Sequence, residues 1–139
     1  MIGILSGREA MTEAQAAQLA PLTLAYVGDS VFDLFVRTVL IQRHTGNAGA
    51  LHKKSVKMVN ARAQAAFGNS IRDGLTEREL NIFMRGRNAK SATVPKNMSV
   101  SDYKHATAVE ALVGYLYLTG QNERLNELLG GMEFENGTE

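Results

Sequence analysis

Apolar side chains recur at three- and four-residue spacing along most of this chain. Such spacing predicts amphipathic helices, and polar residues typical of helix starts and stops separate them. The expected fold is therefore all-α. The helices are expected over residues 12–20, Pro21–Leu40, Ala50–Arg72, 76–84, Asp102–Leu118 and Asn122–Leu129.

The helix over Pro21–Leu40 is the stretch around which the rest of the chain is expected to pack. Its apolar side chains, projected at about 100° per residue, cover both sides, which is typical of a buried helix. Asp29 lies among them, and burying a lone carboxylate is costly unless it finds a partner. Gly28 costs helix stability, which predicts close approach of another backbone or of a ligand, although packing alone would also explain it.

Helix starts are marked by capping boxes that begin at Thr12 and at Thr76. Ser101 is expected to cap the helix over Asp102–Leu118, with Gly120 just past its end.

That helix repeats the anomaly of Asp29, because Glu110 lies in the middle of an otherwise apolar face. If the two helices pack together, Asp29 and Glu110 converge, and two close carboxylates repel unless one is protonated or a cation lies between them. Oxygen ligands without Cys or suitably spaced His favour Mg²⁺, with Mn²⁺ as a substitute, over Zn²⁺. A protonated Glu, or a buried hydrogen bond to a Tyr, remains the alternative.

A chain of 139 residues is expected to form one domain. Its core should span about 12–130, with residues 1–11 as a loose arm and an acidic tail, 131–139, that is expected to be disordered. There is no apolar run of about 18 residues that could span a bilayer, no signal-peptide pattern and no Cys. A cytoplasmic protein with no membrane association is the expectation.

The net charge of +1 hides a segregation of bases from acids. The stretch from Leu34 to Arg72 has seven bases and no acid, and the stretch from Leu80 to Ser101 has four more and no acid. Such blocks are typical of a surface that meets phosphates. A solvated face that happens to be basic would give the same pattern.

Two segments within these blocks are the candidate phosphate-binding surfaces. The polar face of the helix over Ala50–Arg72 carries Lys53, Lys57, Asn60 and Gln64, and it is either a binding face or simply an exposed side. The stretch from Arg85 to Asn97 is expected to be an exposed loop around Gly86, with side chains that can contact phosphate or a ribose hydroxyl. Its candidate binding residues are Arg85, Arg87, Asn88, Lys90, Ser91 and Lys96, and an ordinary polar connector is the alternative.

Three motifs in this chain resemble those of the ribonuclease III family. LAYVGDSVFD, from Leu24 to Asp33, resembles the family's signature, and ATAVEALVGYLYL, from Ala106 to Leu118, resembles its second metal motif. The intervening RGRNAKS, the short length and the lack of a double-stranded-RNA-binding domain are similar to the Mini-ribonuclease III branch. The resemblance covers about Pro21–Leu129.

The resemblance implies an all-helical homodimer that cuts double-stranded RNA to leave a 5′-phosphate and a 3′-hydroxyl. It also implies maturation of the large-subunit (23S) ribosomal RNA precursor, a task compatible with a helper from among the ribosomal proteins. Asp29 and Glu110 would be catalytic and hold Mg²⁺, and Gly28 would allow close backbone approach. The RNA backbone would be gripped by Arg85, Arg87, Asn88 and Lys90.

The chain departs from the larger family at two acids. Ala25 stands where ribonuclease III has a Glu one turn before the Asp, and Thr107 stands where it has an Asp three residues before the Glu. The Thr107 hydroxyl could still hold a metal-bound water. A catalytically silent ribonuclease-III-like module that binds RNA or assembles with ribosomal proteins is the competing interpretation, as two lost acids would be ordinary there.

Overall fold

The structure is a computed structural model that describes residues 7–43, 46–90 and 94–132, and the regular elements among these residues are all helices, with no strand. The expected all-α class is therefore confirmed. Among the described residues, no helix is long and apolar enough to cross a membrane. The elements in chain order are α1 (Glu13–Ala17), α2 (Pro21–Arg43), α3 (Ala48–Val59), α4 (Ala61–Ile71), the 3₁₀ turn η2 (Arg72–Gly74), α5 (Glu77–Arg87), α6 (Val100–Leu118) and α7 (Asn122–Gly130).

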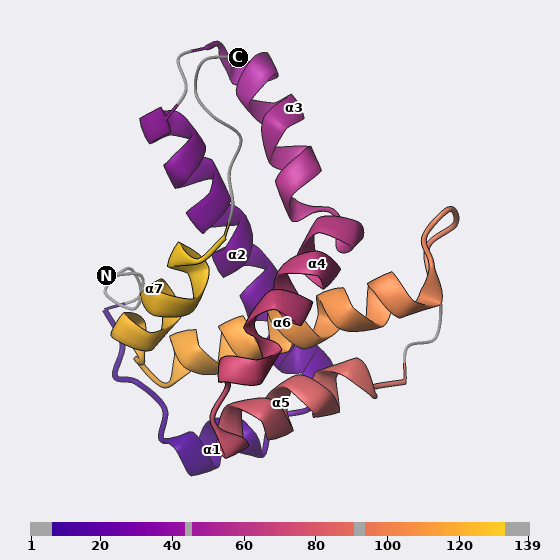
Figure 1. Cartoon of the computed structure of the whole chain (residues 1–139). Helices are drawn as coiled ribbons and strands as arrows, with labels where there is room; N and C mark the ends of the chain where they lie inside the picture. Colours follow the sequence, from indigo (N-terminus) through magenta and orange to yellow (C-terminus); the bar gives the residue numbers. More distant parts are fainter. Residues whose placement is uncertain (1–6, 44–45, 91–93, 133–139) are drawn as a thin grey trace.

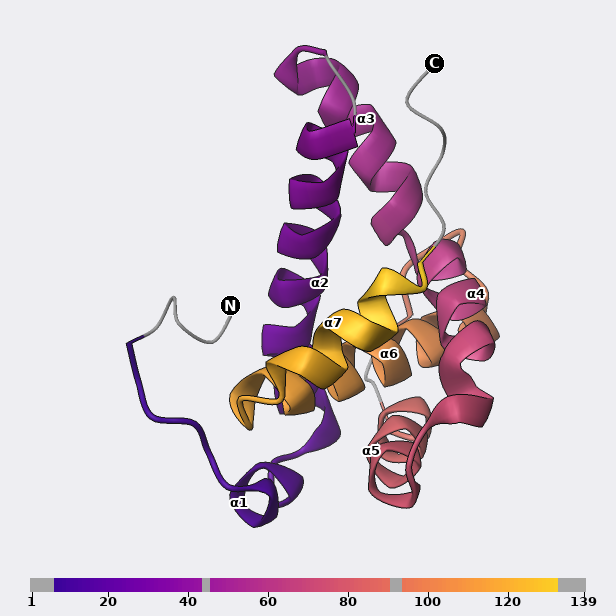
Figure 2. The same cartoon turned by 60° about the vertical axis from the view of Figure 1, so that its left-hand side comes forward.

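The centre of the fold is α6, which runs through the middle of the molecule with α2, α4 and α5 packed around it (Figure 1). Every residue from Ala106 to Leu116 is buried except Glu110. Helix α7 folds back against the end of α6 (Figure 2). The expectation that the Pro21–Leu40 helix is the buried centre was therefore wrong, since α6 has that role.

Helix α2 buries one side against α6 and leaves the other in solvent. Its inward side chains include Leu24, Phe32 and Val36, which are fully buried. Large apolar side chains also remain exposed on the outward side: Leu22 (41%), Tyr26 (84%), Leu34 (43%) and Ile41 (66%). Apolar periodicity alone does not separate a helix buried inside one chain from a helix that presents an apolar face to something else.

Helices α2 and α6 touch backbone to backbone at a pair of glycines. A Cβ atom on Gly28 would overlap the carbonyl oxygen of Glu110, and one on Gly114 would overlap that of Leu24. The close approach expected from Gly28 is therefore real, and the approaching backbone is the one that carries Glu110.

The single helix expected over Ala50–Arg72 is broken in two at Asn60. This residue has an extended backbone (φ −68°, ψ 163°), and its side-chain oxygen accepts a hydrogen bond from Ala63 N at 2.8 Å, which caps α4. An Asn side chain that caps a new helix competes with continuation of the old one. The break redirects the chain, so that α3 packs on α2 and α4 packs on α6.

The exposed loop expected from Arg85 begins later, because α5 continues to Arg87. Gly86 is buried, and a Cβ there would lie 2.9 Å from Ala111 Cβ and 3.1 Å from Thr107 O. The glycine therefore allows α5 to pack closely on α6. The cap of α6 is also shifted, since Ser99 rather than Ser101 accepts from Asp102 N at 3.0 Å.

The two capping boxes form as expected, at Thr12 for α1 and at Thr76 for α5. The arm is fixed to the core at its end, because Met11 N donates to Leu118 O at 2.9 Å. Residues 1–6 and 133–139 lie outside the described residues, so the expectation of a loose arm and a disordered tail stays untested over them.

Candidate active site

The structure brings Asp29 and Glu110 together where α2 crosses α6. Burial, together with hydrogen bonding to and repulsion by the neighbouring Asp29 carboxylate, raises the pKa of Glu110 from 4.5 to about 8. The two acids therefore converge as the sequence predicts. Asp29 itself is exposed, however, and Glu110 is half-buried, so the expected burial of Asp29 was wrong. The site opens to solvent on the α2 side.

A third polar side chain at the site, Gln64, comes from α4. Its amide nitrogen donates to Val59 O at 2.8 Å and lies 3.4 Å from Glu110 Oε2. The side chain is 3% exposed, which corrects the expectation that Gln64 lies on an exposed polar face. The signal that could have placed it is the capping residue Asn60, because a helix that starts there turns Gln64 toward α6 instead of solvent.

The two positions that lack acids are both buried. Ala25 is 7% exposed, one turn before Asp29, and Thr107 is 6% exposed, one turn before Glu110. The Thr107 hydroxyl donates to Tyr103 O at 2.9 Å, so its hydrogen is already used within α6. Its oxygen can still accept a hydrogen bond, which leaves the supporting role predicted for Thr107 a prediction.

The chemistry of this donor set fits a hard divalent cation. Two carboxylates and an amide oxygen are available, with no thiolate, and Mg²⁺ is commonly bound by one or two carboxylates with waters and substrate phosphates completing its shell. Within the part of the chain that the structure describes, no cluster of three or more His, Asp or Glu side chains could hold a metal. A cation here would therefore depend on water or substrate for most of its ligands.

The basic residues at the end of α5 differ in what they contact. Arg85 is half-buried and donates to Ala17 O at 2.8 Å and Leu19 O at 3.2 Å, so it ties α5 to the end of α1. Arg87 donates to the side-chain oxygen of Asn88 at 3.2 Å. Gly86 packs on α6 at Thr107, and Thr107 precedes Glu110 by one turn of that helix. The C-terminal end of α5 therefore lies near Glu110.

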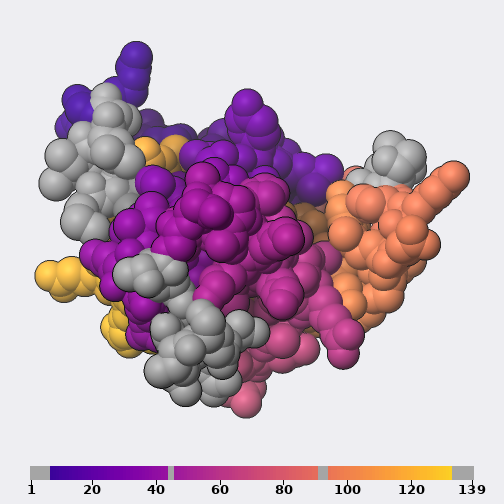
Figure 3. All heavy atoms as spheres, turned by 90° about the horizontal axis from the view of Figure 1, so that it is seen from above, coloured from indigo at the N-terminus to yellow at the C-terminus, as the bar shows by residue number. Residues whose placement is uncertain are grey.

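The remaining loop candidates, Lys90 and Lys96, are both exposed, as expected. Ser91 lies outside the described residues. The segment that leads into α6 projects from the body of the molecule (Figure 3). It offers an exposed basic surface beside the N-terminal half of α6.

The second basic surface is on α3, where Lys53 and Lys57 are exposed. Lys57 precedes Val59 by two residues, and the Val59 carbonyl shares the Gln64 amide with Glu110. The C-terminal end of α3 therefore lies beside the acids, on the opposite side of α6 from α5 (Figure 1).

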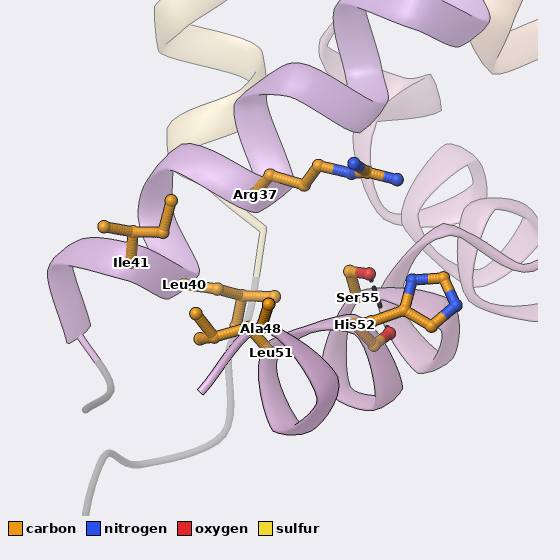
Figure 4. Close-up of a pocket in the computed structure, with 7 residues that line it drawn as sticks. All are labelled: Arg37, Leu40, Ile41, Ala48, Leu51, His52 and Ser55. Carbon is orange, nitrogen blue, oxygen red and sulfur yellow. Dashed lines mark hydrogen bonds between the residues drawn. The ribbon is translucent and has the colours of Figure 1, made fainter. Parts of the chain in front are cut away.

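A pocket of about 190 Å³ lies elsewhere, between the C-terminal half of α2 and α3 (Figure 4). It is lined by Arg37, Leu40, Ile41, Ala48, Leu51, His52 and Ser55. Leu40 follows Asp29 by eleven residues, which is about 16 Å along a helix. None of the predicted site residues lines this pocket, so it is separate from the paired acids.

The helical fold and its paired acids agree with the protein family that this chain matches. Residues 22–121 match the Ribonuclease III domain family, and this span contains both acids. A crystal structure of a protein from Fusobacterium nucleatum superimposes with a TM-score of 0.75 at 32% identity, covering 81% of this chain and 90% of that one. The fold and the domain match define an endoribonuclease of the ribonuclease III type.

Relatives that match over most of their length show to which branch of this family the chain belongs. The chain is 45% identical over 129 residues to the Mini-ribonuclease 3 of Thermoanaerobacter sp. (strain X514), covering 93% of this chain and 91% of the relative. It is 43% identical over 122 residues to the Mini-ribonuclease 3 of Clostridium tetani, covering 87% and 81% of the two chains. The chain belongs to the Mini-ribonuclease III branch of the ribonuclease III family.

The raised pKa of Glu110 predicts that the metal-free protein loses stability as the pH rises. Between pH 4.5 and about 8 the folded state holds a proton that the unfolded state has lost. The stabilisation is complete below the unfolded pKa and disappears as the pH rises through the folded pKa. Urea unfolding in EDTA at pH 5.5, 7.0 and 8.5 should show a falling midpoint for the wild type.

Glu110→Gln is the matched control, because the amide has no proton to lose in this range. Its midpoint should change less over the same pH series, and Mg²⁺ at pH 8.5 should restore stability to the wild type only. Parallel pH curves for the two proteins would contradict the predicted titration of Glu110.

Proposed function

We propose that this chain cleaves double-stranded RNA with a divalent cation, Mg²⁺ or Mn²⁺, and leaves 5′-phosphate and 3′-hydroxyl ends. The observation that carries the proposal is the convergence of Asp29 and Glu110, with exposed bases of α3 on one side and the basic end of α5 on the other. Paired acids suit a cation that binds phosphate, and flanking bases suit the phosphates of a duplex.

In this proposal Asp29 and Glu110 hold the cation. A bound Mg²⁺ would supply activation of water and neutralisation of the charge on the phosphodiester. The chain supplies orientation, because the glycine contact between α2 and α6 fixes the backbone at both acids. The exposed Lys53, Lys57 and Lys90 contact phosphates and hold the duplex across the acids.

The cellular substrate proposed from the family resemblance is the 23S ribosomal RNA precursor, processed in the cytoplasm. A ribosomal-protein helper would belong to the same process. In this proposal the domain around the paired acids itself provides contacts that hold the RNA. The exposed bases near the acids are suited to that role.

The proposal includes a homodimer that forms through the outward face of α2. Four large apolar side chains remain exposed on that face, among them Tyr26 with 84% of its surface in solvent. Exposed apolar surface that recurs on one helix favours association, and a two-fold dimer uses the same patch twice. The second copy would cover Tyr26 and its neighbours.

Sedimentation at micromolar concentration should therefore give the mass of a dimer for the wild type and of a monomer for Tyr26→Asp. Burying the new carboxylate in the interface would be unfavourable. Val100→Asp is the control, because Val100 is also an exposed apolar residue (54%) but lies on α6. A monomeric wild type that cleaves RNA fully, or a dimeric Tyr26→Asp variant, would count against this interface.

Asp29→Asn should abolish cleavage while it leaves folding and RNA binding largely intact, because the amide keeps the shape of the side chain and removes its charge. Glu110→Gln should behave alike. The measurement is cleavage of labelled double-stranded RNA with and without Mg²⁺, together with a gel-shift assay for binding.

Asp33→Asn is the matched control on α2. Asp33 lies one turn beyond Asp29 and pairs with Arg37 at 3.1 Å, and this variant should cleave normally. Turnover by Asp29→Asn would remove that residue from the site. A wild type that binds RNA without any Mg²⁺-dependent cleavage would favour the silent RNA-binding module instead.

The exposed lysines of the loop should govern affinity. Replacing Lys90 and Lys96 together by Ala should weaken binding to all duplex sequences and lower the salt slope by about 0.7 to 0.9 for each phosphate that the protein then leaves unneutralised. The residual cleavage at saturating RNA should still require Mg²⁺ and Asp29. Binding measured over a series of salt concentrations tests this.

Arg85→Ala is the control for the lysine replacements, because the Arg85 guanidinium already donates hydrogen bonds to the carbonyl oxygens of Ala17 and Leu19. It should lower the unfolding midpoint and change the salt slope little. If the Lys90 and Lys96 replacements leave affinity and slope unchanged, the loop is only a connector, and the RNA-binding surface moves to Lys53 and Lys57.

A further inference from the structure

Gln64 is the most deeply buried polar side chain beside the paired acids. The residue is 3% exposed, and its amide nitrogen donates to Val59 O at 2.8 Å and lies 3.4 Å from Glu110 Oε2. Its amide oxygen is also buried and has no hydrogen-bond partner among the described residues. One planar amide thus connects the end of α3 with a carboxylate of the site and keeps a free acceptor.

A purely structural explanation accounts for only half of these contacts. Donation to Val59 O satisfies a carbonyl at the C-terminal end of α3, where helical acceptors lack partners. That bond needs one N–H group. It explains neither the second N–H directed at Glu110 nor the buried amide oxygen, and an unsatisfied buried acceptor is unfavourable unless something else pairs with it.

The site around Asp29 and Glu110 also has few polar groups that could orient waters on a cation. The positions one turn before each acid carry Ala25 and Thr107, and the Thr107 hydroxyl hydrogen is bonded to Tyr103 O. No third His, Asp or Glu joins the two acids within the described residues. A cation held by two carboxylates keeps several waters, and those waters need acceptors to orient them.

We propose that Gln64 is a positioning residue of the active site, whose amide N–H orients the Glu110 carboxylate toward Asp29 and whose amide oxygen accepts a hydrogen bond from a cation-bound water. The inference rests on the proposed function, since it requires that Asp29 and Glu110 hold a cation. It extends the site from α2 and α6 to α4. The break at Asn60 then has a functional consequence, because it directs Gln64 toward Glu110.

The test measures binding of Mn²⁺ to the RNA-free protein. The readout is the paramagnetic broadening of the NMR signals of backbone amides near Asp29 and Glu110. Gln64→Leu keeps the volume and removes the amide, while Gln64→Asn keeps the amide but is too short to reach both partners. Loss of an outer-shell partner typically weakens metal binding by about 10- to 100-fold, and we expect a loss in that range for both variants. The Mg²⁺ concentration for half-maximal cleavage should rise in parallel, with unchanged affinity for RNA in EDTA.

Asn60→Ser is the matched control for the junction between α3 and α4. Ser keeps an oxygen that can cap α4, and with it the break that directs Gln64 toward Glu110, but loses the amide that donates to Lys57 O. Asn60 accepts from Ala63 N at 2.8 Å and donates to Lys57 O at 3.2 Å, so it braces the same junction without a hydrogen bond to Glu110. This variant should lower the unfolding midpoint and leave Mn²⁺ binding unchanged. In a Glu110→Gln background, Gln64→Leu should cause little further loss of Mn²⁺ binding, because without the Glu110 carboxylate there is no bound cation for the amide to support.

Mn²⁺ binding at wild-type strength in the Gln64 variants would overturn the inference and leave Gln64 a structural brace. If Gln64→Leu fails to fold, Gln64→Asn decides the question. The failure of the proposed function has a different signature. There, Asp29→Asn and Glu110→Gln would themselves retain Mn²⁺ binding and cleavage, whereas failure of this inference alone leaves those two variants inactive.

Discussion

The backbone contact between α2 and α6 is the constraint on which the rest of the structure depends. Gly28 and Gly114 each occupy a place where a Cβ atom would overlap a carbonyl oxygen of the other helix, that of Glu110 and that of Leu24 respectively. The contact is therefore reciprocal, and it fixes the separation of the two helices without any intervening side chain. Asp29 follows one of these glycines directly, and Glu110 supplies one of the carbonyls. The site is thus set by two regular helices in contact, and such elements hold side chains more precisely than loops do.

This rigidity has an electrostatic consequence. Two acids held by a backbone contact have little freedom to move apart, so their repulsion is relieved by a proton or by a cation. Without a cation the proton resides on Glu110, whose pKa is raised to about 8 by burial and by Asp29. A divalent cation would displace that proton, so its binding should tighten as the pH rises. The fold thereby couples protonation, metal binding and stability at one point, and the Gln64 amide extends that coupling to the junction between α3 and α4.

Features that depend on residue types close together in the chain could be predicted from the sequence, whereas features that depend on how the helices pack could not. The sequence predicts the capping boxes at Thr12 and Thr76, the close contact at Gly28 and the convergence of Asp29 and Glu110 from residue types at short range, and the structure contains these features. Which apolar helix is central does not follow, because α2 and α6 are both apolar on two sides and only the number of surrounding helices distinguishes them. The burial of Gln64 is also hidden, because helical periodicity continued through Asn60 assigns it to the wrong face.

The basic stretch after Leu80 shows why a charge pattern overestimates a binding surface. Arg85 and Arg87 flank Gly86 in the sequence, yet Gly86 packs on α6 and the two arginines have different hydrogen-bond partners. Arg85 meets Ala17 O, a carbonyl in the last turn of α1 that has no acceptor role within that short helix, and it stabilises the fold there. An acid at that position would repel the same carbonyl, so the positive charge of Arg85 has a structural cause. The surface available to RNA is therefore smaller than the acid-free stretch from Leu80 to Ser101. It consists of the bases that stay exposed and do not bind carbonyls at helix ends, and Lys90 and Lys96 are among them.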